Sequence, residues 1–463
     1  MYNKKFFVLA LITMVSLSCF AQTKTIVGLK FAIDSALHNY PELKSKQYQV
    51  ASATASATDA ENQVLPSLTI SDQVDLGTDN GLGGSYFPMS IIPSTSGGIR
   101  AENNANAFSG NIGVAYLQHE LYNFGLNGAR IESANSLVNF SKADYEASSY
   151  LLQFHVAQLY FELLRYRLLV ATQQRNIDRY RVLYGYIKAY TSSGLKPSVD
   201  STIANAEIST ATIQYIQTTE TYNKLKREFI YYTGLQRNDF EIDTAIYYLP
   251  ETWLNRLEEN VSGDSVDNNN PVLEYYNNRW EYSMSQENLI SKSYLPKLYL
   301  VGSAWVRGSS ITPQDVYGNL STGLDYSRYN YMAGLALSYD IVNLIHRNDK
   351  TDIQHYQSES AREDVVEQKT LLESQLKQAD IAIQAAIDRA REIPLLLSAA
   401  QNVYAQKLAQ YNAGLANITD LTDASYLLYK AETDQSEVLP FLLSTLLQKA
   451  VANNTLNTFL ANF

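Results

Sequence analysis

The sequence predicts an α+β membrane protein made of two internal repeats, in which long helices alternate with pairs of strands. The first observation is a repeated spacing: Pro41 and Pro66 are 25 residues apart, and Pro271 and Pro296 are again 25 residues apart. The second is a set of period-two segments about ten residues long, and the third is a pair of very long helical segments. Similarity at such a long period is the mark of a duplicated structural unit.

Each of the 25-residue intervals predicts a helix that leads directly into a strand. An asparagine, Asn39 or Asn270, stands just before the opening proline, and a Leu-Pro pair closes the interval at Leu65-Pro66 and Leu295-Pro296. Proline suits the first turn of a helix and is disfavoured in its interior, so each interval begins and ends on a helix boundary. Small residues at i, i+4 and i+7 give the first helix a stripe for close packing, namely Ala53, Ala57 and Ala60.

Strands follow these helices. Leu68, Ile70, Val74 and Leu76 alternate with polar residues, which predicts a strand with one apolar face. A loop rich in Gly, Ser and Asn separates it from a returning strand, so that each repeat contains a hairpin. The four strands are expected near residues 67–76, 112–116, 298–306 and 329–339.

Strands of about ten residues are long enough to cross ~25–30 Å of hydrocarbon when tilted. Beyond the first residues of the chain, no run of about 18 or more apolar residues predicts a transmembrane helix. Four strands are too few for a membrane barrel, since the smallest have about 8, and an open edge in lipid leaves backbone groups unpaired. We therefore expect several copies of the chain to complete the barrel together.

Long helices fill most of each repeat. Residues 126–191 carry a hydrophobic stripe through Leu152, Val156, Leu159 and Leu163, with a weak break at Gly185. At 1.5 Å per residue, a helix of this length reaches ~100 Å. Such a helix far exceeds what a compact domain uses and is comparable to the depth of a periplasm.

Each long helix ends at a turn with a recurring sequence, "SSGLKPSVD" in the first repeat and "NAGLANITD" in the second. Glycine breaks the helix at its C-terminal end, and Ser198 and Thr419 are candidate N-caps for the returning helices. These helices are expected to run to about residues 233 and 454. The two turns align at an offset of 220 residues, with Gly194 over Gly414, Leu195 over Leu415, and Asp200 over Asp420.

The chain divides, on this reading, into four parts. Residues 1–21 form a signal peptide, with Lys4 and Lys5 before an apolar run and small residues near a cleavage site after Ala21. An alternative makes Cys19, the single cysteine, a lipidated residue, although the residues before it lack the expected order. Repeat 1 then covers residues 22–234, a linker or equatorial segment covers 235–270, and repeat 2 covers 271–463.

Composition and motifs disfavour several classes of function. The formal net charge of −11 and the lack of a basic patch disfavour nucleic acid, because nothing would neutralise its phosphates. The five histidines show no metal-ligand spacing, and no nucleophile elbow, phosphate loop or dinucleotide motif occurs. We expect no enzyme activity, no cofactor and no bound metal.

Asp420 and Asp423 support two interpretations. They lie three residues apart at the start of a helix, where carboxylates complement the positive helix end. In a closed oligomer around a pore, symmetry would instead repeat each carboxylate into an acidic ring that attracts cations. From the residues alone both interpretations stay open.

The twin Asn and Pro starts, the twin Leu-Pro ends and the twin Gly-Leu turns together resemble the TolC-type outer-membrane efflux family over essentially the whole mature chain. The resemblance implies a homotrimer in which four strands per chain build one 12-stranded β-barrel in the outer-membrane lipid, continued by an α-helical tunnel through the periplasm. It also implies a passive exit duct, for efflux or type I secretion, that works with a periplasmic adaptor protein and an inner-membrane transporter. The alternative from another class is a helical periplasmic scaffold without a pore.

The resemblance also assigns roles to residues near the turns. It implies a gate with an acidic ring at Asp420 and Asp423 and a latch between Asp200 and Tyr411. The best-studied member of the family carries an arginine two residues after the second turn glycine, where this chain has Ala416, so part of that latch is absent here. The adaptor is expected to contact Gly194, Leu195, Ser198, Gly414, Leu415 and Thr419.

Overall fold

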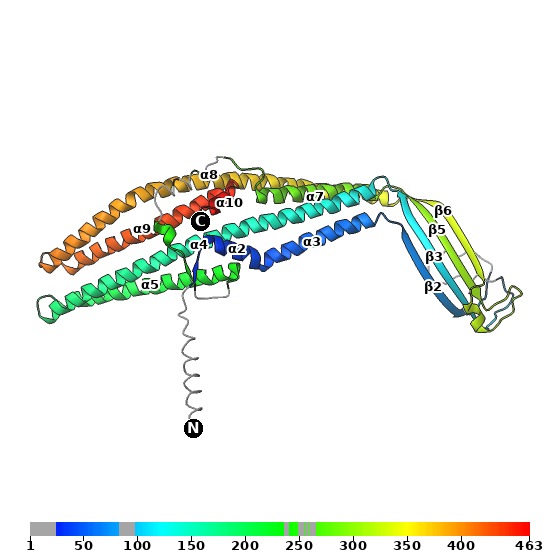
Figure 1. The fold of residues 1–463 in the computed structure, drawn as a ribbon, viewed down its shortest axis with the longest axis horizontal. Helices are drawn as coiled ribbons and strands as arrows, with labels where there is room; N and C mark the ends of the chain where they lie inside the picture. The colour runs from blue at the N-terminus through cyan, green and yellow to red at the C-terminus, as the bar shows by residue number, and fades with distance from the viewer. Residues whose placement is uncertain (1–24, 83–97, 236–239, 249–254, 256–258, 260–264) are drawn as a thin grey trace, which may run out of the picture. The chain divides into compact units, whose positions relative to one another are not determined.

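A computed structural model describes residues 25–82, 98–235, 240–248, 255, 259 and 265–463 (Figure 1). The predicted signal peptide at 1–21, with Cys19, and residues 83–97 of the first hairpin loop lie outside this range. The chain forms two compact units. The helical unit comprises residues 1–49, 142–277 and 363–463, and the sheet unit comprises residues 50–141 and 278–362.

The order of elements repeats once along the chain. The first half contains β1 (Thr25–Val27), α2 (Leu29–Asn39), α3 (Pro41–Asn62), β2 (Ser67–Gly77), β3 (Phe108–Tyr122), α4 (Leu126–Ser192) and α5 (Ser198–Thr233). The second half contains β4 (Phe240–Ile242), η2 (Ala245–Tyr248), α7 (Pro271–Ser293), β5 (Lys297–Ser309), η3 (Leu320–Leu324), β6 (Arg328–Ser338), α8 (Asn343–Asn412), α9 (Ile418–Ala452) and α10 (Leu456–Leu460). The predicted helix, hairpin and long-helix order of both repeats is confirmed.

The repeated prolines lie at helix and strand boundaries. Pro41 and Pro271 are the first residues of α3 and α7, where the missing N–H of proline costs no helical hydrogen bond. Pro66 and Pro296 directly precede β2 and β5. The shared 25-residue spacing therefore measures the same helix, followed by the same strand, in both repeats.

The asparagines before these prolines connect the beginning of each repeat to the end of its last long helix. Asn39 Nδ2 donates to the carbonyl of Thr233, 3.3 Å away, at the end of α5, and Asn270 Nδ2 donates to the carbonyl of Val451, 2.8 Å away, near the end of α9. Both carbonyls lie in the last turn of a helix, where no intrahelical donor remains. Gly234 caps α5 with φ of +67°, and a Cβ at this position would come within 2.6 Å of the Asn39 side chain, so glycine suits both the backbone and the space.

The described residues of the sheet unit form an antiparallel sheet with the strand order β2-β3-β5-β6. In its register, Ile70 pairs with Ala115, Ala115 pairs with Ala304, and Ala304 pairs with Tyr331. Pairing of β3 with β5 joins the hairpins of the two repeats. A β-bulge between Glu120 and Tyr122 interrupts this pairing close to the start of α4.

One face of the sheet is apolar and exposed in the single chain. Because side chains alternate along a strand, residues that share this register lie on the same face. Their exposed fractions range from 59% to 85%. The set comprises Leu68, Ile70, Val74 and Leu76 on β2 and Tyr329, Tyr331, Leu335 and Leu337 on β6.

The core of the helical unit surrounds the middle of α4. Helices from both halves of the sequence pack there, and the side chains at the centre are fully buried. Tyr160 Oη lies 3.3 Å from the carbonyl oxygens of Val27 and Asp243, which connects α4 to the small parallel sheet of β1 and β4. The central residues are Val156, Ala157, Leu163 and Leu164 of α4, Leu443 and Leu447 of α9, and Leu456 and Phe459 of α10.

Candidate functional site

The two predicted turns have the same backbone structure. In the α4–α5 hairpin, Gly194 has φ of +72° and the N–H of Leu195 donates to the carbonyl of Tyr190 at 3.0 Å. In the α8–α9 hairpin, Gly414 has φ of +75° and the N–H of Leu415 donates to the carbonyl of Gln410 at 2.8 Å. Both are Schellman turns, in which glycine accepts the left-handed conformation without steric cost.

The predicted N-caps at Ser198 and Thr419 are wrong. Helix α5 is preceded by Pro197, whose side chain makes no capping hydrogen bond, and Ser198 is already its first residue. Helix α9 is capped by Asn417, whose Oδ1 accepts a hydrogen bond from the N–H of Asp420 at 2.8 Å. Asparagine ranks above threonine at this position, so α9 begins two residues earlier than expected.

A buried hydrogen bond joins the two hairpins. Tyr411 Oη, in the last turn of α8, donates to Asp200 Oδ2, in the first turn of α5, at 2.9 Å. Tyr411 is 1% exposed and Asp200 is 7% exposed. Tyr411 belongs to an apolar cluster whose other buried members are Ile177, Tyr180, Leu183, Ile187, Ala204, Ala211, Ile418 and Leu421.

Burial raises the pKa of the Tyr411 hydroxyl above its ordinary value, and the hydrogen bond to Asp200 raises it further. Both effects favour the neutral phenol, because a phenolate here would be desolvated and would face a carboxylate. Tyr411 is therefore a proton donor throughout the physiological range of pH. The structure thus brings together the two residues that the resemblance assigned to a latch.

The two aspartates of the expected ring have different surroundings. Asp423 is exposed, whereas Asp420 is partly buried and its Oδ2 lies 3.8 Å from Lys407 Nζ of α8. Asn417 already satisfies the backbone N–H of Asp420, so neither carboxylate is needed as the N-cap of α9. Both carboxylates are therefore available to interact with other charged groups.

The tips of the hairpins expose apolar side chains. Leu195 is 69% exposed and Leu415 is 80% exposed, although the residue after the glycine of a Schellman turn frequently packs back on its own helix. Val199, one turn further on, is 56% exposed. Exposed apolar side chains therefore lie at the turns of both hairpins.

A series of polar contacts between α4 and α9 lies further from the turns and was not predicted. Arg179 Nη2 lies 2.6 Å from both carboxylate oxygens of Glu432, and these side chains are only 14% and 17% exposed. Arg165 bonds Glu437 at 2.9 Å, and Thr172 Oγ1 lies 2.8 Å from Ser436 Oγ. The sequence signal for these contacts was the presence of polar residues on the inward faces of both helices. Which residues pair depends on how far α4 and α9 are shifted along each other, and the sequence does not give this shift.

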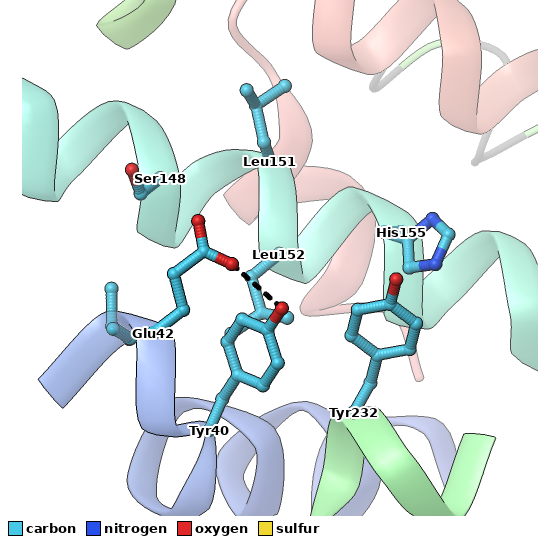
Figure 2. A pocket seen from close by; sticks show the side chains of 8 residues that line it. Tyr40, Glu42, Ser148, Leu151, Leu152, His155 and Tyr232 are labelled. Carbon is cyan, nitrogen blue, oxygen red and sulfur yellow. Dashed lines mark hydrogen bonds between the residues drawn. The ribbon is translucent and has the colours of Figure 1, made fainter. Parts of the chain in front are cut away.

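A pocket lies elsewhere in the helical unit, between α2, α3, α4 and α5 (Figure 2). Its volume of about 220 Å³ is below the ~300–1,000 Å³ typical of small-molecule sites. Tyr40 Oη donates to Glu42 Oε2 at 2.9 Å on one side of the pocket, and His155 and Tyr232 lie on the other side. None of the residues predicted for the gate lines this pocket.

Within the part of the chain that the structure describes, no group of three or more His, Cys, Asp or Glu side chains is placed to hold a metal ion. In the same residues, none of the helices combines the length and the apolar character needed to cross a membrane.

Two repeats of long helices, each with a β-hairpin that contributes to one exposed apolar sheet face, define a class of channel-like α+β membrane proteins. A family model described as outer membrane efflux protein matches residues 32–226 and 267–448. Because this match covers most of the chain, the protein belongs to that family of outer-membrane efflux channels. No curated protein sequence matches the chain.

Solved structures of outer-membrane proteins, two of them described as outer-membrane channels, share this fold. VceC from Vibrio cholerae is 15% identical, with a TM-score of 0.70 over 93% of this chain and 95% of that chain. CmeC from Campylobacter jejuni is 14% identical, with a TM-score of 0.74 over 92% and 86%. The open state of MtrE from Neisseria gonorrhoeae is 15% identical, with a TM-score of 0.66 over 92% and 89%.

Proposed function

We propose that three copies of this chain form an outer-membrane exit duct, with twelve strands closed into one barrel and the helices extended as a periplasmic tunnel. The single chain supports this proposal with its exposed apolar sheet face and with β2 and β6, which are the outer strands of a four-stranded order. Strand edges in lipid leave backbone groups unsatisfied unless other strands pair with them. Neighbouring copies supply that pairing.

The duct is closed at the hairpin turns by the bond between Tyr411 and Asp200. This bond carries the proposal, because it joins the α4–α5 hairpin to the α8–α9 hairpin next to their turns, and it is buried. Parting the hairpins exposes both groups and breaks a hydrogen bond to a carboxylate. Asp420 and Asp423, repeated in three copies, surround the passage with negative charge.

A periplasmic adaptor protein opens the duct by binding the turns. Leu195 and Leu415 are suited to this contact since they are largely exposed, and the remaining expected contact residues, Gly194, Ser198, Gly414 and Thr419, are also exposed around them. An inner-membrane transporter drives the cargo, and the duct itself is passive. A scaffold without a pore offers no use for the apolar face of the sheet, so we do not favour that alternative.

The Tyr411→Phe variant tests the gate. It keeps the ring and removes the donor, and hydrogen bonds to charged groups contribute about 1.5–3 kcal/mol. The ratio of open to closed channels in planar bilayers is expected to rise about tenfold or more. Tyr186→Phe is the matched control, because Tyr186 lies on α4 near the turn but is 62% exposed.

Tyr411→Phe channels that open no more than the wild type would show that this bond does not hold the duct closed. A purified wild-type protein that neither inserts into bilayers nor conducts would contradict the exit-duct proposal itself.

A further inference from the structure

A lysine from the first turn contacts the tyrosine of the second hairpin. Lys196 follows Gly194 by two residues, and its Nζ donates to the carbonyl oxygen of Tyr411 at 3.0 Å. The same Nζ lies over the Tyr411 ring, 4.2 Å from the ring centroid. One partly buried cation thus holds both the backbone and the side chain of Tyr411.

The position of this contact suits a cation. The carbonyl of Tyr411 belongs to the last turn of α8, where unsatisfied carbonyl groups concentrate negative charge. The N–H of Gly414 already donates to this carbonyl at 3.1 Å, and Lys196 adds a second donor. The ring face adds the attraction of its π electrons for an ammonium group.

The two repeats differ at this point. Lys196 and Ala416 are equivalent, since each follows its turn glycine by two residues, but Ala416 is packed against the apolar cluster. The second turn has no Lys or Arg of its own. In the structure, Lys196 of the first turn provides the cation that contacts Tyr411. Lys196 and Asp200, both from the α4–α5 hairpin, then hold Tyr411 from two sides.

We propose that Lys196 is a second latch residue, which fixes Tyr411 so that its hydroxyl meets Asp200 and which itself ties the end of α8 to the first turn. This inference rests on the proposed gate. It makes the latch of this protein a clamp of three residues, Lys196, Tyr411 and Asp200, with its cation in repeat 1.

The test compares Lys196→Met and Lys196→Arg with the wild type in planar bilayers. Methionine keeps an unbranched apolar side chain of similar length without the charge, so the ratio of open to closed channels is expected to rise about five- to tenfold. Arginine keeps the charge and is expected to restore most of the closed population. Thermal unfolding of Lys196→Met is expected to match the wild type, because the lysine joins hairpins at one end and is not part of the core.

Lys188→Met is the matched control. Lys188 is an exposed lysine of α4 whose Nζ lies over the ring of Tyr184, 5.7 Å from its centroid, within its own helix. This variant loses a cation on an aromatic ring without touching the second hairpin, and it is expected to stay closed.

Tyr411→Phe separates the two proposals. If Tyr411→Phe opens the channel and Lys196→Met does not, the lysine has no part in the latch while the gate stands. If neither variant opens the channel, the gate fails, and the role of Lys196 fails with it.

Discussion

The buried pair of Tyr411 and Asp200 shows how two residues from different repeats create a polar contact inside an apolar cluster. A carboxylate that is 7% exposed requires donors, and the tyrosine hydroxyl is one that carries no charge. The contact is therefore stable only while the hairpins stay together. This makes it suitable as a switch for an opening motion.

The raised pKa of Tyr411 sets the pH at which this contact is lost. The pKa of Tyr411 in the folded protein lies above the ordinary value of about 10. The hydrogen bond to Asp200 therefore contributes its full stabilisation below about pH 10, and this stabilisation is lost as the pH rises through the folded-state pKa. We expect wild-type open probability to stay constant from pH 7 to 9.5 and to increase only at higher pH. Channel recordings across this range measure it.

Tyr411→Phe is expected to lack this alkaline increase, because it has no phenolic hydroxyl to ionise. An opening transition centred below pH 9 that Tyr411→Phe abolishes would contradict a raised pKa at Tyr411.

Among the helices, the elements most open to prediction were those with local signals. The turns at Gly194 and Gly414 were predicted because glycine encodes the left-handed residue of a Schellman turn within a few positions. The ion pair of Arg179 with Glu432 was not, since its members are 253 residues apart and meet only through the packing of α4 on α9. The cap at Asn417 was missed because Thr419 offers a similar local pattern.

The Glu432→Gln variant tests how much the ion pair of Arg179 with Glu432 contributes to the free energy of unfolding. It leaves the Arg179 guanidinium largely buried without its carboxylate, and breaking a buried pair costs about 3–5 kcal/mol. We expect a clear loss of stability in urea unfolding of the detergent-solubilised protein. Asp178→Asn is the control: it breaks an exposed pair with Arg181, 59% and 58% exposed, and is expected to change stability by about 1 kcal/mol or less. An equal loss of stability in the two variants would show that the buried Arg179 pair stabilises the protein no more than the exposed pair does.

For the whole molecule, the duplicated order and the four strands followed from periodicity alone. The parallel pairing of β1 with β4 did not, because strands of three residues carry too little pattern and join distant parts of the chain. Asp72 interrupts the apolar face of β2, and only the structure shows its partner, the Tyr326 hydroxyl at 2.8 Å. The proposed acidic ring belongs to this scale as well, since it requires several copies of the chain around one passage.

The ring is best tested by the reversal potential of single channels in a planar bilayer under a salt gradient. We expect the wild type to be cation-selective and the Asp420→Asn, Asp423→Asn double variant to lose most of this selectivity at similar conductance. Unchanged selectivity in the double variant would contradict an acidic passage at the hairpin turns, and the absence of conductance in both proteins would contradict the duct.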